Sequence, residues 1–585
     1  MRTNLLLLLA GLWLSTPLPA QVFLNLDFEY PVYGQTIPQK WYLAGEGYEQ
    51  ALDSTIRHFG QFSLRMGREE AGPDAFGVCG GNFPVDLARG KSIAYRGWIR
   101  TEKVAGGFAG LWWRVDGKEG ILGFDNMGDR GLSGDSGWTE VAIEMKVDSA
   151  ATNINFGALL VGSGTAWFDR LEIWVDGEPY LEPLPRVSAP TAEELEWLRT
   201  NVIPLRTVDP DGSSDADLAP LKKLLADARV VGLGEVTHGS SEIFRMKHRL
   251  VRFLREQLDF DLFSIEANMP EAYRLDDYVL NGEGDPVDLI RGMYFWTWRT
   301  EEVLAMVEWM RAHNGEGKDA IRFTGFDMQY YAGSLEELSH LSSPPPTAAL
   351  DTLRSRLDWL NENSRWRRGN FGLTDEQAGQ FAQLLSEQRA WIEGHISEPS
   401  ERAWALQNVR LLEQYLDHTS FNKRDVYMAE NLTWIAERHP GSKIALWAHN
   451  GHIQKSDGRM GQYLAETFGD AYLTIGFAFH EGAYTAIGKE GLSAYEAQAS
   501  YPGTYEYFFQ AIDEPIFLLD LRAVSREDPA SKWIFENLPF RQTGAMNIPN
   551  EFIEAALYDD FDLILFVRES SASSLLPIFR SIGKQ

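Results

Sequence analysis

Histidines and carboxylates stand at the ends of four apolar runs in this 585-residue chain. They are Glu235 and His238 after 228–235, Glu266 in 260–268, Asp327 in 321–329, and His449 and His452 after 443–448. A neutral imidazole can take a proton from water, and a carboxylate can fix its tautomer and stabilise the imidazolium. If the four runs are parallel strands, these side chains meet at one edge of a sheet. The pattern therefore predicts a site for water activation.

The same residues allow a second chemistry. His449 and His452, three residues apart, would together with Glu266 supply three ligands of a catalytic zinc ion. Spacing alone does not decide between a metal-free site and a metal site. Asp327 has a structural alternative as well, because a carboxylate after a strand often caps the following helix.

Several common site types are absent from the sequence. No serine has glycine at both −2 and +2, and the chain has no Walker A, no HExxH and no GxGxxG after a strand. A single cysteine, Cys79, excludes an intrachain disulfide and a cysteine-rich zinc site, and we expect it to be buried. The net charge of −30 disfavours nucleic acid and anionic lipid surfaces as partners.

The elements that would position these residues alternate between strand and helix. Apolar strands are expected at 228–235, 260–268, 321–329, 443–450, 471–479, 516–522 and 561–569, with helices between them such as 242–258 and 301–314. This alternation predicts an α/β domain over 186–585, with a mostly parallel sheet and flanking helices. Residues 346–440, after three consecutive prolines, show helical periodicity without strands and predict an inserted helical hairpin.

The chain before this domain has a different pattern. Between 21 and 185, short segments alternate polar and apolar residues and are separated by Gly, Asp and Asn, which predicts an all-β antiparallel sandwich. The segment 178–194 is rich in proline and ends with Thr191 as a helix cap and Glu194 three residues on. We therefore place the domain boundary between 185 and 186.

Residues 1–20 have the pattern of a secretory signal peptide. Arg2 is followed by an apolar run over 5–14 and by Leu18-Pro19-Ala20 before Gln21. No later segment approaches 18 uninterrupted apolar residues. We expect a cleaved protein that is secreted or periplasmic, with no membrane span in its mature form.

Four sequence blocks resemble the erythromycin esterase family. They are GLGEVTHGSSEIFRMKHRLVRFL (232–254), SIEAN (264–268), KRDVYMAENLTWI (423–435) and ALWAHNGHI (445–453). In this resemblance Glu235 and His238 fall on the family's GExxH motif and Glu266 on its second-strand glutamate. Arg424 falls on RDxxMAxN, and His449 and His452 on HNxH.

The resemblance implies a hydrolase of carboxylic esters or lactones without a serine nucleophile and without a cofactor. His238 would activate water, and either Glu266 or Glu235 would orient it. His449, His452, Arg424 and Lys247 would stabilise the oxyanion or bind substrate. Lys247 stands where macrolide-inactivating members carry an arginine, which keeps the charge but loses the bidentate fork. A macrolide-like or glycosylated small molecule is the implied substrate, with a possible part in antibiotic resistance.

The N-terminal region resembles galactose-binding-like, carbohydrate-binding sandwich modules. The likeness is carried by NLDFEY (25–30), PQKWYLAG (38–45), DSTIRHFGQFSLRM (53–66) and GTAWFDRLEIWVDG (164–177). Trp112, Trp113 or Tyr95 could stack on a sugar, or could fill the sandwich core. Two other functions therefore stay open, a divalent-metal-dependent hydrolase and a non-catalytic carbohydrate-binding protein.

Overall fold

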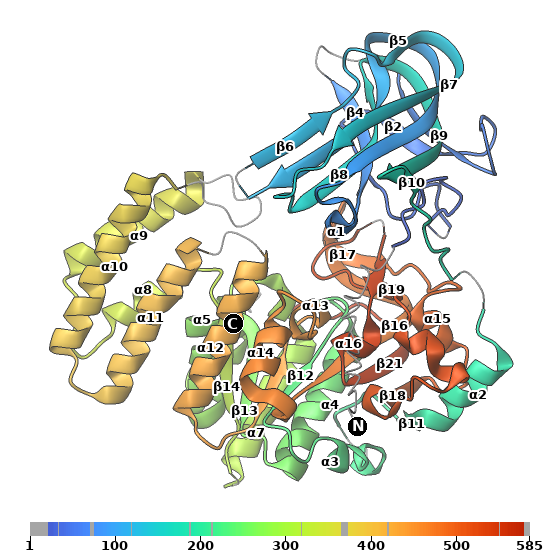
Figure 1. Ribbon diagram of the computed structural model, residues 1–585. Coiled ribbons are helices and arrows are strands. Elements are labelled where there is room, and N and C mark those ends of the chain that lie inside the picture. The colour runs from blue at the N-terminus through green and yellow to red at the C-terminus, as the bar shows by residue number, and fades with distance from the viewer. Residues whose placement is uncertain are drawn as a thin grey trace, which may run out of the picture. The chain divides into compact units, whose positions relative to one another are not determined.

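The structure is a computed structural model and describes residues 22–577, except 33, 71–74, 119, 187–188, 212–213, 318, 364–372, 418–420 and 549. The expected signal peptide, residues 1–20, lies outside the described residues. The chain divides into two compact units, one ending at Pro185 and the other beginning at Arg186 (Figure 1). Within the described ranges, no helix is both long and apolar enough to cross a membrane.

The N-terminal unit is β-rich, and its described residues form one short helix, α1 (Val85–Ala88). Its strands pair antiparallel, in the order β1-β4-β8-β5-β9-β3-β2, with β6 and β7 on β5 and β10 on β9. The strands are β1 (Tyr42–Ala44), β2 (Glu49–Asp53), β3 (Ser63–Arg68), β4 (Phe76–Asn82), β5 (Ser92–Gly117), β6 (Gly120–Asp125), β7 (Leu132–Lys146), β8 (Asn153–Val161), β9 (Ser163–Val175) and β10 (Glu178–Pro179). This arrangement is compatible with the expected sandwich.

The core of this unit contains the aromatic side chains considered for sugar stacking. Tyr95 and Trp113 are fully buried, and Trp112 is buried with its indole N–H donating to the carbonyl of Cys79 at 3.1 Å. They therefore fill the core. Cys79 is a buried free cysteine, and burial raises the pKa of its thiol to about 12.

The C-terminal unit is built on a sheet with the order β11-β18-β21-β16-β12-β15-β13-β14. Its strands are β11 (Val202–Pro204), β12 (Val230–Leu233), β13 (Leu262–Asn268), β14 (Arg322–Asp327), β15 (Ile444–Trp447), β16 (Tyr472–Gly488), β18 (Ile516–Asp520) and β21 (Leu563–Ser570). Every residue of β12, β13 and β15 is buried, so this part of the sheet is covered on both faces. That coverage explains why these strands read as continuous apolar runs.

The sheet is mixed, because antiparallel pairings at β18 accompany the parallel pairings that the sequence indicates. Pairings from β21 through β16, β12, β15, β13 and β14 are parallel, whereas β18 pairs antiparallel with both β21 and β11. In addition, β16 extends beyond the sheet to pair antiparallel with β17 (Gly491–Glu496), and β19 (Leu538–Arg541) forms a separate ladder with β20 (Phe552–Ala555). Strand direction depends on the path of the connection, which apolar patterning does not encode.

Helices flank the sheet or form a layer of their own. They are α2 (Ala192–Asn201), α3 (Leu221–Leu224), α4 (Ser241–Leu258), α5 (Met269–Asn281), α6 (Pro286–Gly292), α7 (Glu301–Gly315), α8 (Ala332–Ser339), α9 (Thr347–Asn363), α10 (Asp375–His395), α11 (Pro399–Asp417), α12 (Phe421–Arg438), α13 (Asn450–Ile453), α14 (Met460–Phe468), α15 (Tyr505–Gln510) and α16 (Leu557–Asp560). Short 3-10 turns lie at Asp215–Leu218, Trp296–Trp298, Gly469–Ala471, Leu521–Ala523 and Pro529–Phe535. Helix α2 begins with a capping box between Thr191 and Glu194.

The segment expected as an inserted helical hairpin contains helices α9 to α12. Helices α8 to α11 share a separate apolar cluster that includes Leu357, Leu385, Val409 and Leu412. Helix α12 instead packs on β14 and α14, with Met428 and Leu432 in the main core. Figure 1 shows α9, α10 and α11 in yellow and orange, standing beside the sheet, with α12 against it. The insertion is therefore a helical layer that ends before α12.

The turn between β12 and α4 packs tightly on the extension of β16. The carbonyl of Gly239 accepts from the N–H groups of Thr485 at 2.9 Å and Ser573 at 2.8 Å. A Cβ at Gly239 would lie 2.6 Å from the backbone nitrogen of Thr485 and closer still to its carbonyl oxygen. This contact fixes the path of the chain directly after His238.

We therefore predict that Gly239→Ala destabilises the C-terminal unit by about 1–3 kcal/mol, because backbone must move to admit one methyl group. Gly292→Ala is the matched control, since a Cβ there meets no atom within 4 Å. Urea unfolding monitored by tryptophan fluorescence measures both. Equal stability of the two variants would contradict the tight contact.

Candidate active site

A cavity of about 410 Å³ opens where strands β12, β13 and β15 end. Five of the residues singled out from the sequence line it, namely His238, Glu266, Arg424, His449 and His452. Two others, Glu235 and Lys247, have no exposed surface and lie behind the cavity wall. The structure thus gathers all seven around one place, in two layers.

His238 and Glu235 form a histidine–carboxylate pair at the end of β12. The imidazole Nδ1 of His238 lies 2.6 Å from Oε1 of Glu235, and the His238 side chain is 13% exposed. Because Nδ1 faces the carboxylate, this contact favours the tautomer with the proton on Nδ1 and the lone pair on Nε2, on the opposite side of the ring. The His238 side chain, held in this way, lines the cavity.

Glu235 is a fully buried carboxylate held by three donors. Besides His238, its Oε2 accepts from Lys247 Nζ at 2.7 Å and from the Trp447 indole at 2.8 Å. Burial raises the pKa of Glu235, but the Lys247 ammonium and His238 outweigh it, and the pKa lies below its ordinary value. Glu235 is therefore ionised at neutral pH.

Lys247 projects from α4 into the protein interior. Its ammonium donates to Glu235 and to the carbonyl of Ala448, and lies 4.3 Å from the centroid of the Trp447 ring. Burial lowers the pKa of Lys247 to about 8, and Glu235 opposes that shift. The sequence predicts that Lys247 stabilises the oxyanion or binds substrate. In the structure its ammonium instead contacts Glu235, and Lys247 does not line the cavity.

A second charged group surrounds Arg424 at the start of α12. Its guanidinium donates to Glu266 at 2.7 Å and to Asp327 through Nε at 3.1 Å and Nη2 at 2.6 Å. Burial lowers the pKa of Arg424, but Asp327 and Glu266 outweigh it and raise the pKa above its ordinary value. Glu266 also accepts the backbone N–H of His449 at 3.0 Å. Arg424 is thus a fixed cation in the cavity wall.

His452 completes this group with a carboxylate of its own. Nδ1 of His452 contacts Asp425, and Nε2 lies 3.2 Å from Glu266 and 3.0 Å from Arg424 Nη1. Burial alone lowers the pKa of His452, but Glu266 and Asp425 outweigh it and raise the pKa to about 9. Two cations, Arg424 and His452, are therefore enclosed by three carboxylates.

His449 has a different surrounding from the other two histidines. Its Nδ1 accepts the N–H of Gly451 at 3.0 Å, and its Nε2 donates to the carbonyl of Val236 at 3.2 Å. Burial, with smaller contributions from His238 and His452, lowers its pKa to about 3. His449 is neutral at physiological pH and joins the start of α13 to the end of β12.

Sequence reasoning missed two contributors to this site. Asp425 is fully buried behind His452, although it directly follows Arg424 in the third sequence block. Asp327, which the sequence places at the same sheet edge with a helix cap as its alternative, binds Arg424. The loop 542–545 lines the cavity, and its Gly544 carbonyl accepts the N–H of His238 at 3.1 Å. No sequence motif marks that loop, and it lies far along the chain from the strand ends that carry the other site residues.

In the described part of the chain, no preformed ligand set supports the alternative of a zinc site. There, no group of three or more His, Cys, Asp or Glu side chains has an arrangement that could hold a metal ion. Both nitrogens of His449 are hydrogen-bonded to the main chain, and His452 is held between Asp425 and Glu266.

Known proteins match the C-terminal unit. The sequence model of the family described as erythromycin esterase matches residues 255–570. The YbfO protein of Bacillus subtilis is 26% identical over 385 residues, which is 58% of this chain and 83% of YbfO. Erythromycin esterase type II of Escherichia coli is 25% identical over 430 residues, covering 65% of this chain and 99% of that protein.

A solved structure matches the fold. A mutant of the erythromycin esterase EreC in its open conformation has a TM-score of 0.51 and 20% identity, covering 63% of this chain and 98% of that chain. The C-terminal unit therefore has an erythromycin-esterase-like fold. Glu235, His238 and Lys247 precede the residues matched by the family model.

The raised pKa of His452 generates a prediction about stability. A group whose pKa is higher in the folded state stabilises the protein fully below its unfolded pKa and loses that effect as pH rises through the folded pKa. We expect a contribution on the order of 1–3 kcal/mol that is present below about pH 6.5 and lost by about pH 9. Lys247 acts in the opposite direction above about pH 8, so the test is the difference between wild type and His452→Gln.

Urea unfolding at pH 6, 7.5 and 9 measures this difference. We expect the stability advantage of wild type over His452→Gln to shrink as pH rises across this range. His395→Gln, a change in an exposed helix residue, is the control and should show no such trend. A constant advantage at all three pH values would contradict a protonated His452 in the folded protein.

Proposed function

The chain belongs to the erythromycin esterase family, and on this premise we propose that it hydrolyses carboxylic ester or lactone bonds with a water molecule activated by His238. Family membership supports hydrolase activity, and the geometry around His238 supports the mechanism. One observation carries the proposal. An imidazole bonded through Nδ1 to an ionised buried carboxylate lines a cavity in whose described wall there is no Ser or Cys.

In the proposed reaction, Nε2 of His238 takes a proton from water as the water oxygen attacks the ester carbonyl carbon. The carbonyl π electrons move to oxygen and give a tetrahedral oxyanion. As the intermediate collapses, the bond to the alcohol oxygen breaks, and the imidazolium returns its proton to the leaving alkoxide. Glu235 holds Nδ1–H throughout and stabilises the imidazolium. No covalent acyl-enzyme forms.

Arg424 and His452 are the candidates for stabilising the oxyanion. Both line the cavity, and both carry positive charge that the surrounding carboxylates sustain. His452 would act through its charge alone, because both its ring nitrogens already contact protein groups. Fixed donors in a site that excludes water stabilise developing negative charge without reorganisation. We assign Glu266 and Asp327 to holding Arg424, which leaves Glu235 as the carboxylate that orients His238.

Lys247 is a positioning residue in this proposal. Its ammonium keeps Glu235 ionised inside the protein, where an unpaired carboxylate would otherwise take up a proton. His449 is also a positioning residue, because both ring nitrogens bind main chain. Neither side chain needs to touch the substrate.

The proposed substrate is a small ester or lactone, macrolide-like or glycosylated. The name of the Escherichia coli relative supports a macrolactone, and a cavity of about 410 Å³ lies within the usual range of roughly 300–1,000 Å³ for small-molecule sites. The signal-like segment 1–20 supports action outside the cytoplasm.

Mutation of His238 tests the mechanism. The wild-type protein is first tested on a panel of macrolides, acyl sugars and simple lactones. On any substrate that it hydrolyses, we predict that His238→Ala lowers kcat/KM by about 10²–10⁴-fold, because this is the usual contribution of a general base. His340→Ala, in an exposed histidine, is the control and should retain activity. Hydrolysis is measured by liquid chromatography with and without EDTA.

Two results would reject this mechanism. Undiminished hydrolysis by His238→Ala would remove the general base from its role. Loss of activity in EDTA, with recovery on addition of zinc, would favour the metal-dependent alternative. A folded protein that hydrolyses none of the panel would leave the non-catalytic alternative standing.

We also propose that the N-terminal unit binds carbohydrate. The observation in favour is a group of half-buried aromatic side chains on β5, β7 and β9, namely Trp98, Trp138 and Trp174. The ring of His58 stacks on Trp98 with centroids 4.2 Å apart, and Arg96 lies over Trp174 at 5.5 Å. Aromatic faces combined with polar side chains can recognise a sugar ring.

A further inference from the structure

A second cavity, of about 540 Å³, lies in the C-terminal unit. Its wall comes from α5, α8, α11, α12 and the start of β14, and it shares no residue with the cavity at His238. Arg424 at the start of α12 lines the first cavity, and Arg438 at the end of the same helix lines the second. At 1.5 Å per residue, these positions are about 21 Å apart along the helix.

Three half-buried aromatic side chains line this second cavity. The rings of Tyr273 and Trp404 have centroids 4.6 Å apart and an interplanar angle of 32°. The rings of Trp404 and Trp434 lie 6.1 Å apart at 43°. These rings come from three helices, and they give the cavity an apolar wall.

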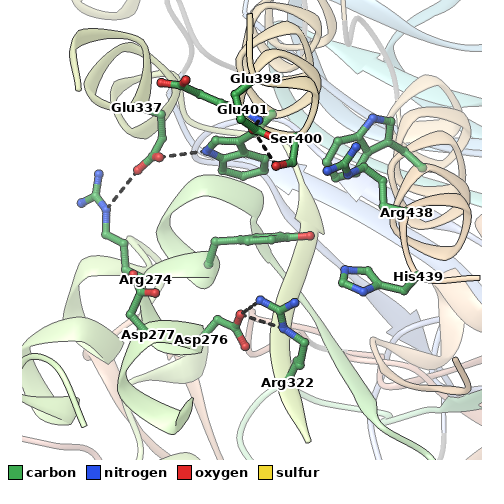
Figure 2. A pocket seen from close by; sticks show the side chains of 13 residues that line it. Arg274, Asp276, Asp277, Arg322, Glu337, Glu398, Ser400, Glu401, Arg438 and His439 are labelled. Carbon is green, nitrogen blue, oxygen red and sulfur yellow. Dashed lines mark hydrogen bonds and ion pairs between the residues drawn. The ribbon is translucent and has the colours of Figure 1, made fainter. Parts of the chain in front are cut away.

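Charged side chains of both signs complete the wall. Arg322 donates to Asp276 through Nε at 3.0 Å and through Nη2, and Glu337 accepts from the Trp404 indole at 2.9 Å. Figure 2 shows these interactions as dashed lines, with Arg438 and His439 on the other side of the cavity. The paired groups are held in fixed positions and still have lone pairs and N–H groups to offer.

His439 adds a polar group without adding charge. Burial, together with the nearby Arg322 guanidinium, lowers the pKa of His439, so its imidazole is neutral at physiological pH. A neutral imidazole is both a donor and an acceptor. Arg438 lies over Trp434 at 5.4 Å and presents N–H donors beside that ring.

We propose that this second cavity binds a neutral carbohydrate, with the apolar face of a sugar ring against the aromatic side chains and its hydroxyls on the surrounding charged and imidazole groups. Sugars combine a C–H face with hydroxyls that are both donors and acceptors, and the wall offers a partner for each. This binding site is independent of the proposed ester hydrolysis.

Charge argues against the other ligand classes. An organic cation that used the rings would face the guanidinium groups of Arg274, Arg322 and Arg438. An anion would face five carboxylates, namely those of Asp276, Asp277, Glu337, Glu398 and Glu401. A purely apolar ligand would displace water from these polar groups without replacing the hydrogen bonds of that water, which is unfavourable. A polyol avoids all three penalties.

Isothermal titration of the full chain with methyl β-D-galactoside, methyl β-D-glucoside and methyl β-D-xyloside tests the proposal. We expect at least one glycoside to bind and Trp404→Ala to weaken that binding about tenfold or more, which corresponds to roughly 1.4 kcal/mol. Trp404→Phe keeps a ring but loses the indole N–H, and we expect an intermediate affinity. Glu437→Ala, an exposed residue of the same helix as Arg438, is the matched control.

These variants also separate the cavity from other places where a glycoside could bind. Binding that is unchanged in both Trp404 variants would locate the sugar elsewhere, including the N-terminal unit, and would overturn the proposal. If Trp404→Ala fails to fold, Trp404→Phe and His439→Ala decide in the same way. Absence of binding by all three glycosides, or Trp404-dependent binding of betaine or phosphate in their place, would also overturn it.

Discussion

The buried carboxylate of Glu235 is the constraint on which the site depends. An ionised side chain with no exposed surface is tolerated only when partners replace its lost hydration, and an unpaired one costs several kcal/mol. Its three partners come from separate parts of the chain, namely His238 after β12, Lys247 on α4 and Trp447 at the end of β15. Satisfying this one charge therefore fixes the relative positions of two strands and a helix, and with them the orientation of the His238 ring.

The opposite wall of the cavity is also held together by buried charges that satisfy one another, and it contains more of them. Glu266, Asp327 and Asp425 enclose Arg424 and His452, so that positive charge remains in the wall of the cavity. The two histidines differ in their surroundings, because Glu235 beside His238 is shared with a lysine, whereas His452 lies between two carboxylates. We therefore propose that local charge separates the proton acceptor from the electrostatic stabiliser.

Much of this arrangement could be predicted from the sequence, because buried parallel strands are continuous apolar runs and their ends converge. That reasoning located Glu235, His238, Glu266 and His452. It could not place Lys247, since a lysine on a helix is expected at the surface until a buried carboxylate is known to face it. The antiparallel edge at β18 and the loop 542–545 depend on long-range pairing, which local periodicity does not contain. The resemblance to a family, in turn, implies the proposed substrate class but not the contact between Asp425 and His452.

The protonation state of His238 tests the account most directly, and it needs no substrate. Nitrogen-15 NMR of the histidine side chains at pH 7, with the signals assigned by comparison with His238→Ala, reports which ring nitrogen carries the proton. We predict a proton on Nδ1, where Glu235 accepts it, and a bare Nε2 toward the cavity. Glu235→Gln should disturb this pattern. A proton on Nε2 in the wild-type protein would contradict the assignment of His238 as the base that activates water.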